Sequence, residues 1–454
     1  MKKGEVTAYL SLVFILLLSF IGGIMEAASV QMAKSYRRAD VNRAMESVFA
    51  EYQKELLEEY DVFALDGSYE TGNYSEQNIE KRKEFYGASD MEHMVKRIEF
   101  LTDNGAKAFY EQVAAYMRHK YGVDALKDKT GITDVWKNQQ DQAQEYQKDE
   151  LKKQQDLEAL LQENEGALPE KDNPIAHVEQ LKKSSFLELV MPKNKKVSEK
   201  TIDGETVLSV RNRNQGYGDF SDVSEEYGTL TTLLFGEYLL KHFDCAAGEP
   251  GDGALDYELE YILEGKESDR ENLEAVAKKL LLLRFVPNYA HLQKSGAKKA
   301  EAEAMALALC SILAVPAITE AAAQVILLVW AFGESVMDIR SLLNGSRVPL
   351  VKSEESWQLS LAGLLKLGES EDLNDGKDIK NGLPYEEYLR MLLFLEKKET
   401  AGIRTLDMIE QNLRMEHGLS FFHADYCISK IEVTTTCHLR RGITYRFQTY
   451  FGYN

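Results

Sequence analysis

Acidic side chains are concentrated in the stretch GEPGDGALDYELEYILEG. The carboxylates that could do chemistry there are Asp252, Asp256, Glu258, Glu260 and Glu264. Paired carboxylates can act as the acid and base of a hydrolase, and clustered ones can hold calcium. The spacing does not match an EF-hand, and Glu260 and Glu264 would share one helix face, whereas a glycosidase pair flanks its substrate. We therefore expect a solvated acidic face.

Side chains that could bind zinc lie near the end of the chain. They are His417, His423, Cys427 and His438. Their spacing fits no pair of ligands on one helix face, so the sequence predicts no metal site.

A third polar group follows an apolar segment, in WAFGESVMDIRSLL. Glu334 and Asp338 are one helical turn apart, and Arg340 comes two residues later. This pattern is typical of a buried or half-buried polar network. The sequence contains no H-E-x-x-H, G-x-S-x-G or Walker phosphate-loop motif. We expect no catalytic, cofactor-binding or metal-binding residues, and hence a protein that is not an enzyme.

Charge and cysteine content exclude further classes of function. The chain has 454 residues and a formal net charge of −20. Because nucleic-acid affinity comes largely from Lys and Arg, we expect no nucleic-acid partner. The cysteines at 245, 310, 427 and 437 form no C-x-x-C pair, which excludes zinc ribbons and thioredoxin-type motifs. Cys427 and Cys437 would lie roughly 33 Å apart on one straight strand, too far for a disulfide.

The chain begins MKKGEVTAYLSLVFILLLSFIGGIMEAASVQMAKSYRRAD, in which Val6 to Met25 carries no charge. As a helix, this segment is about 30 Å long, the thickness of the hydrocarbon core of a bilayer. We expect it to be a permanent membrane anchor. The alternative is a cleavable export signal that ends at Ala27-Ala28-Ser29, although such signals usually have shorter apolar runs.

The segment after the anchor is amphipathic. Its apolar residues recur at helical spacing, and they are Val41, Met45, Val48, Phe49, Tyr52, Leu56 and Tyr60. No Gly or Pro interrupts residues 26–66. The sequence therefore predicts one helix from about Val6 to Tyr60, and the alternative is an anchor and a separate core helix joined by a bend.

The chain as a whole is predicted to be α+β and predominantly helical. By composition it divides into 1–60 (anchor and spine helix), 61–131 (small α+β module), 132–200 (charged, coiled-coil-like arm and linker), 201–345 (helical body) and 346–454 (C-terminal α+β region). The arm is rich in Gln, Lys, Glu and Asp. Pro169, Pro174 and Pro192, together with the lysine cluster at 193–200, indicate a mobile linker.

Local patterns predict individual elements. DVFALDG is typical of a short strand that ends in a turn, and Ser268 with Glu271 forms a capping box that begins a helix. Two nearly uncharged segments, Ala304 to Thr319 and Ala321 to Gly333, are each shorter than a membrane span and are interrupted by Pro316 and Glu320, so we expect two buried helices packed as a hairpin. A re-entrant or second membrane passage is the alternative. ISKIEVTTTCHL and ITYRFQTYFGY alternate around Arg440-Arg441-Gly442, which predicts a β-hairpin.

Four stretches of the sequence carry a family resemblance. They are ESVFAEYQKELLEEYDVFALD, LDYELEYILEGKESDRENL, WAFGESVMDIRSLLNGSRVPLVK and LPYEEYLRMLLFL. They resemble a family of large, uncharacterised membrane-anchored proteins of Gram-positive type, a domain of unknown function associated with Tad-type (tight adherence) pilus machinery. The resemblance covers most of the chain. It implies a single-pass helix in the cytoplasmic membrane, a body on the extracellular side, and pilus or secretion assembly proteins as partners. It brings no catalytic residues.

The N-terminus resembles that of a pseudopilin in part. Lys2-Lys3-Gly4 suits a prepilin leader, but the fifth residue after Gly4 is Tyr9, where true pilins have Glu, and Glu5 directly follows the glycine. This departure weakens the case for a filament-core subunit and leaves an accessory or tip subunit. We expect an uncleaved anchor, with cleavage after Gly4 or after Ser29 as alternatives.

These observations predict a non-enzymatic, membrane-tethered, pseudopilin-like component that assembles, caps or docks a Tad-type pilus or related secretion apparatus. The alternatives are a cell-surface scaffold or sensor unrelated to pili, and an anchored hydrolase with an acidic cleft. The basic residues before and after the anchor nearly balance, so orientation rests on the resemblance rather than on charge.

Overall fold

The computed structural model describes residues 3–122, 133–164, 166–224, 228–311, 313, 315–369, 372 and 374–453. Lys2 of the basic leader and the expected segment boundary at 131–132 lie outside these residues. The chain forms two compact units. Unit 1 comprises Met1–Gln112, Asn212–Glu225 and His417–Asn454, and unit 2 comprises Val113–Arg211 and Glu226–Glu416. The fold is α+β and predominantly helical, as predicted. The five-part division by composition stays a prediction.

Helix α1 (Lys3–Phe49) opens unit 1 and has two different halves. No side chain from Val6 to Met25 is buried, whereas Val41, Met45 and Val48 are at most 1% exposed. The uncharged first half therefore lies bare, and the amphipathic second half packs on the rest of unit 1.

The helix ends earlier than the sequence predicts. It is continuous through Glu26 as far as Phe49, and a separate helix α2 (Lys54–Tyr60) follows after a break at residues 50–53. In this break Gln53 is extended, and its backbone N–H donates to Ala64 O at 2.8 Å. The prediction of one helix to Tyr60 was wrong beyond Phe49, because residues 50–53 leave the helix and the backbone of Gln53 bonds to Ala64 instead of continuing the helical ladder.

The strands of unit 1 form one antiparallel sheet. They are β1 (Leu65–Asp66), β2 (Glu92–Phe100), β3 (Cys427–His438) and β4 (Thr444–Gly452). Strand β3 pairs with the other three, and the β3–β4 register aligns Cys437 with Tyr445. The predicted C-terminal hairpin and the short strand in DVFALDG are confirmed. Residues 440–442 form its turn (η3, Arg440–Gly442), in which Arg441 and Gly442 have positive φ angles.

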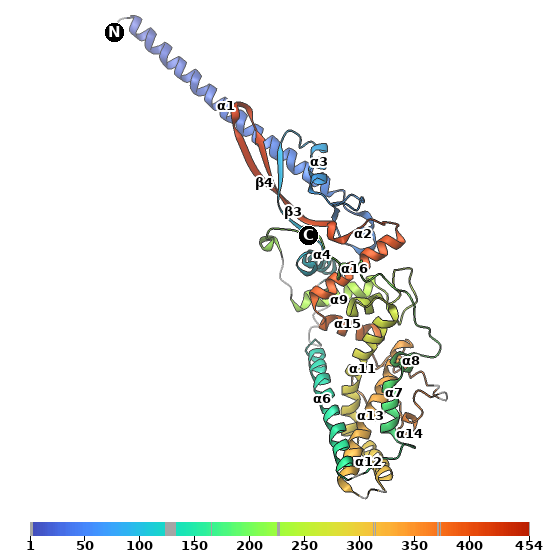
Figure 1. The fold of residues 1–454 in the computed structure, drawn as a ribbon. Helices are drawn as coiled ribbons and strands as arrows, with labels where there is room; N and C mark the ends of the chain where they lie inside the picture. Colours follow the sequence, from blue (N-terminus) through green and yellow to red (C-terminus); the bar gives the residue numbers. More distant parts are fainter. Residues whose placement is uncertain are drawn as a thin grey trace. The chain divides into compact units, whose positions relative to one another are not determined.

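The core of unit 1 lies between the second half of α1 and the sheet. Val48 and Phe49 belong to a buried cluster with Ile98, Ile431 and Val433. The ring of Phe49 stacks on that of Phe451, with centroids 4.3 Å apart. Figure 1 shows the β3–β4 hairpin running beside α1.

Two more helices belong wholly or partly to unit 1, and the second of them continues past Gln112, where the first segment of this unit ends. Helix α3 (Glu76–Phe85) begins at Ser75, whose hydroxyl accepts from the Gln77 N–H. Helix α4 (Asp103–Tyr121) follows β2, and its first turn contains left-handed backbone at Asn104, Gly105 and Ala106. Short 3-10 turns, η1 (Ser221–Val223) and η2 (Ala424–Tyr426), lie in the remaining loops.

Helix α13 (Pro316–Leu343) is the core of unit 2. In the most apolar 18-residue stretch of this helix, 94% of the residues are buried. It packs against α6 (Thr133–Glu163), α11 (Asp269–Lys294) and α12 (Gly296–Cys310). The two helices around Pro316 pack against each other as expected, but only α13 is largely buried, since Leu307 on α12 is 64% exposed. Pro316 occupies the first turn of α13, where no N–H is required. Ser268 is the N-cap of α11, as predicted: its Oγ accepts from Glu271 N at 3.3 Å and donates to Glu271 Oε2 at 3.0 Å.

The segment expected to be a linker is largely helical. It contains α7 (Pro174–Lys183) and α8 (Phe186–Val190), and both pack on α13. Pro174 sits in the first turn of α7 behind the N-cap Asn173, so this proline begins a helix rather than marking a mobile segment. Helix α6 is the expected charged helix, but it is not a free arm, since Trp136 and Leu157 are buried.

The remaining helices of unit 2 surround these elements. They are α9 (Thr229–His242), α10 (Glu258–Glu264), α14 (Leu361–Leu364), α15 (Tyr385–Leu395) and α16 (Lys398–Glu416). Helix α10 packs on α11, α15 and α16.

Candidate functional site

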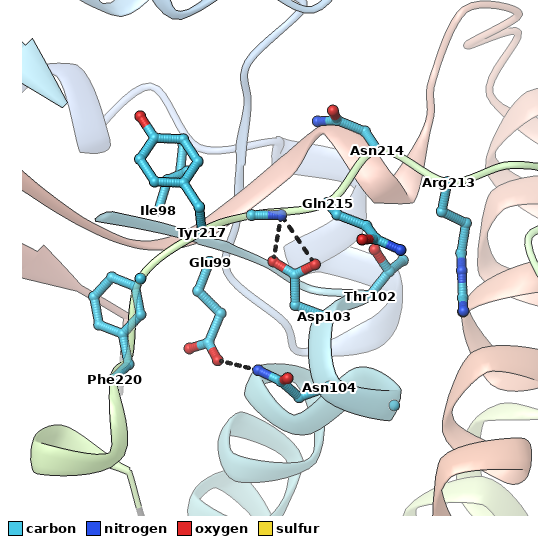
Figure 2. Close-up of a pocket in the computed structure, with 13 residues that line it drawn as sticks. Ile98, Glu99, Thr102, Asp103, Asn104, Arg213, Asn214, Gln215, Tyr217 and Phe220 are labelled. Carbon is cyan, nitrogen blue, oxygen red and sulfur yellow. Dashed lines mark hydrogen bonds between the residues drawn. The ribbon is translucent and has the colours of Figure 1, made fainter. Parts of the chain in front are cut away.

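A polar pocket of about 250 Å³ lies in unit 1, where β2 ends and α4 begins (Figure 2). Its second wall is the loop at 213–220. Its lining residues are Ile98, Glu99, Thr102, Asp103, Asn104, Gly105, Arg213, Asn214, Gln215, Gly216, Tyr217, Gly218 and Phe220.

The loop is held to the outer edge of β2 by backbone hydrogen bonds. Ile98 N donates to Tyr217 O at 2.9 Å, and Tyr217 N donates to Ile98 O at 3.0 Å. A Cβ atom on Gly216 would lie only 2.1 Å from Ile98 O, so this close approach requires glycine.

Asp103 is the carboxylate at the centre of the pocket wall. Figure 2 shows it facing the loop between Gln215 and Tyr217. In this loop the Gly216 N–H donates to both carboxylate oxygens at 3.1 Å. A second donor, Phe100 N, lies 2.7 Å from Oδ2. Burial raises the pKa of Asp103, while these two backbone donors oppose the rise. Asp103 therefore serves as a brace between β2, α4 and the loop.

Glu99 is the second carboxylate of the pocket, and it is paired with a buried lysine. Lys430 on β3 is 1% exposed, and its Nζ lies 3.1 Å from Glu99 Oε2 and also contacts Glu111. Burial alone would lower the pKa of Lys430, but the two carboxylates outweigh it and raise that pKa. The charge of Glu99 is thus already neutralised within the sheet.

This pocket can admit a small polar molecule, but it is poorly equipped for acid–base chemistry. Both carboxylates are engaged, and the described lining contains no Ser, Cys, His or Lys side chain. The buried hydroxyl of Thr102 has no hydrogen-bond partner within the described residues, so it is available to a ligand.

A buried ion network in unit 2 includes the acids predicted on α13. Lys352 Nζ lies 2.5 Å from Glu334 Oε1 and 2.6 Å from Asp338 Oδ1. Arg284 of α11 pairs with Asp338 Oδ2 at 3.0 Å. All of these side chains are at most 1% exposed. The expected polar network is confirmed, with two acids balanced by two cations.

The pKa values of the two acids in this network depend on their burial and on the cations beside them. Burial raises the pKa of Glu334, although Lys352 opposes the rise. Burial would also raise the pKa of Asp338, but Arg284 and Lys352 outweigh it and lower that pKa. Arg340 turns elsewhere, to Leu189 O at 2.7 Å and to Asp372 at 2.7 Å. Lys352 and Arg284 were missed in the sequence, because they lie 14 and 54 residues from Asp338.

Residues 164–439 match a family of unknown function, DUF5702, which covers more than half of the chain. The chain belongs to this family. The DUF5702 region contains α7 to α16 and β3, and it leaves out α1. No curated protein and no solved structure matches the chain.

Within the DUF5702 region, the acidic stretch is not the solvated face that the sequence predicted. Glu258 and Glu260 are 4% and 0% exposed. Glu258 accepts from Asp244 N at 2.9 Å and from Asn412, and Glu260 accepts from Ala246 N at 3.0 Å and Tyr385 Oη at 2.7 Å. Burial raises the pKa of each to about 7. The expectation was wrong because the neighbouring loop and α15 offer donors that spacing along the chain does not reveal.

The other acids of this stretch remain near the surface. Asp252 is exposed, Asp256 pairs with Lys200 at 2.7 Å, and Glu264 pairs with Lys279 at 2.8 Å. Because Glu258 and Glu260 bind separate sets of donors, the five carboxylates do not converge on one cleft.

Of the side chains in the DUF5702 region that were considered for zinc, His423 and Cys427 are neighbours, while His417 and His438 contact other residues. His417 lies 3.8 Å from Glu59, and His438 lies 3.8 Å from Glu92 at the far end of β3. Cys427 Sγ contacts His423 O at 3.5 Å. The cysteines are thiols rather than disulfides, so the prediction of no bond between Cys427 and Cys437 is confirmed.

Proposed function

We propose that this chain is a non-enzymatic, membrane-tethered protein of the cell envelope, a pseudopilin-like component that assembles, caps or docks a Tad-type pilus or related secretion apparatus. Its body would lie on the extracellular side of the cytoplasmic membrane. The pilus association and the sidedness rest on the sequence resemblance.

The division of α1 is the observation that carries the proposal. One unbroken helix has a bare apolar half of bilayer length and a second half buried against a sheet. Such a helix can stand in lipid, or in a filament core, while its other half is part of a folded unit. This arrangement supports a tether fixed rigidly to unit 1.

The placement of the acids favours a structural role over hydrolysis. A hydrolase needs carboxylates that meet in an accessible cleft. Here Glu258 and Glu260 are buried on separate donors, and Asp103 and Glu99 hold a loop and a lysine in place.

Crosslinking in intact cells tests the proposed partners. A photoreactive residue at Phe20, in the bare half of α1, or at Tyr36, which is 66% exposed, should capture pilus or secretion assembly proteins. The matched control is the same residue at Val48, which is 0% exposed and should react only within the chain. Capture of envelope proteins unrelated to such machinery would favour the scaffold alternative.

Mass spectrometry of the N-terminus of the native protein tests the tether. A chain that starts at Met1 or Lys2 supports an uncleaved anchor, and one that starts at Glu5 supports pseudopilin-type processing. A chain that starts at Val30 would contradict the tether, because the apolar half of α1 would be gone.

A further inference from the structure

Basic side chains gather on unit 1 where the apolar half of α1 ends. We call this group the basic collar, and its members are Lys34, Arg37, Arg38, Arg440 and Arg441. Three come from α1 and two from the turn of the β3–β4 hairpin. A concentration of positive charge is unexpected on a chain whose net charge is −20.

Contacts along the hairpin bring these two sources together. Arg441 forms an ion pair with Glu26, the first residue after the uncharged segment. Further along α1, Lys34 Nζ lies 5.3 Å from the centre of the Tyr445 ring, and the Arg38 guanidinium lies 5.8 Å from that of Phe447. The hairpin therefore follows α1 as far as the end of the apolar segment at Met25 (Figure 1).

The collar presents its charge to solvent. The Arg441 side chain is 74% exposed, and Arg38 and Arg440 are also exposed. Two nearby acids are paired, Glu26 with Arg441 and Asp40 with Arg43 at 3.0 Å, and two more, Asp90 and Glu92, are exposed. The five cations of the collar together with Arg43 outnumber these four acids. The surface next to the apolar segment is thus positive.

Distances along the helix place the collar at the surface of a bilayer. If the hydrocarbon core ends at Met25, the hairpin turn lies level with the headgroups, which extend roughly 5–8 Å beyond that core. Lys34 lies about 14 Å beyond Met25 along the helix axis, at 1.5 Å per residue. The Debye length at physiological salt is about 8 Å, so charge at this distance from the lipid is partly screened. The two turn arginines would therefore feel lipid charge at close range, and the α1 cations would reinforce them.

We propose that the basic collar binds the anionic phosphate headgroups of phospholipids around the anchor. This inference rests on the proposed membrane tether. Arginine suits the role because its planar donors match phosphate oxygens in pairs. Binding through the hairpin turn would fix unit 1 against the bilayer at a second point besides α1.

The test uses the full chain in nanodiscs of mixed phosphatidylglycerol and phosphatidylcholine, followed by native mass spectrometry of the lipids retained. We expect the retained lipid to be enriched in phosphatidylglycerol over the bulk ratio. Arg440→Gln and Arg441→Gln should each lower that enrichment by about fivefold at low salt. Lys377→Gln and Lys380→Gln, each a single substitution at an exposed position of unit 2, make the same change of charge and should leave the enrichment unchanged.

The outcomes separate the collar from the tether. Retained lipid at the bulk ratio, or enrichment that survives both arginine substitutions, overturns the collar proposal. A chain that enters no nanodisc, including those of phosphatidylcholine alone, overturns the tether instead. Arg38→Gln, on α1 rather than in the turn, provides a variant that keeps the hairpin sequence, and it should also lower the enrichment.

Discussion

Helices α1 and α13 each carry an apolar segment long enough to cross a bilayer, yet their surroundings are opposite. In the most apolar 18-residue stretch of α1 none of the residues is buried, whereas in that of α13 94% are buried. Helix α13 is surrounded by α6, α11 and α12, while the first half of α1 extends beyond the sheet that covers its second half. Apolar length alone therefore does not identify a membrane helix; the neighbours of the helix decide.

The two helices also differ in what ends their apolar segments. In α1 the first residue after the apolar segment, Glu26, forms an ion pair with Arg441 of the basic collar, and both side chains are exposed. In α13 the apolar segment ends at Glu334 and Asp338, whose charges are matched by buried cations. An acid in a buried helix must bring its partners into the core, whereas an acid beyond an exposed segment keeps its contact with water.

Removal of residues 1–33 is the strongest test of this comparison. The bare apolar half of α1 is deleted, while the buried side chains from Val41 to Phe49 remain. We expect the shortened protein to be monodisperse without detergent, as measured by size-exclusion chromatography with light scattering. Continued dependence on detergent would mean that α13 or another surface contacts the membrane.

Asp338→Ala should destabilise unit 2 by about 3–5 kcal/mol, because Arg284 and Lys352 would remain buried with one carboxylate fewer. Urea unfolding followed by circular dichroism measures the change. Glu320→Ala removes an exposed acid from the first part of the same helix, and it should alter the unfolding free energy by less than about 0.5 kcal/mol. Equal effects of the two substitutions would contradict the buried network.

Leucine truncations compare the two apolar segments directly. Leu328 on α13 is 0% exposed, and Leu16 on α1 is 63% exposed. Leu328→Ala should lower the unfolding free energy by about 2–5 kcal/mol, since it leaves a cavity. Leu16→Ala, measured on the full chain in detergent, should leave unfolding of the body unchanged. A large effect at Leu16 would mean that the first half of α1 packs on the protein.

Glu260 on α10 is a buried acid that differs from those on α13, because no ion pair joins it to a cation within the described residues. Burial raises the pKa of Glu260 from 4.5 to about 7, and its donors are a backbone N–H and a tyrosine. Below pH 4.5 both folded and unfolded states are protonated. Between pH 4.5 and 7 only the unfolded state loses its proton, so the unfolding free energy falls as pH rises and then levels off.

Glu260→Gln should remove this pH dependence. The variant should therefore gain stability relative to the parent as pH rises from 4.5 to 7, by up to about 3 kcal/mol. Urea unfolding across that pH range measures the difference. Glu249→Gln, at an exposed position in the same acidic stretch, controls for the change in net charge. A difference that does not change with pH would contradict the buried position of Glu260.

Much of the local structure could be predicted from the sequence, because it depends on neighbouring residues. Four features follow from residue types within a few positions: the uncharged segment of α1, the N-cap at Ser268, the break between helices next to Pro316 and the C-terminal hairpin. Backbone hydrogen bonding and side-chain spacing determine these features within one element.

Tertiary structure alone decided which of these elements face solvent and which side chains meet. The sequence could not show that α1 stops at Phe49, that Glu258 and Glu260 are buried, or that Lys352 lies between Glu334 and Asp338. The polar pocket of unit 1 could not be predicted either, since Asp103 and Gly216, which form a hydrogen bond there, are 113 residues apart in the sequence. Such contacts depend on how distant segments share one core, and that packing is not encoded in the spacing of any single segment.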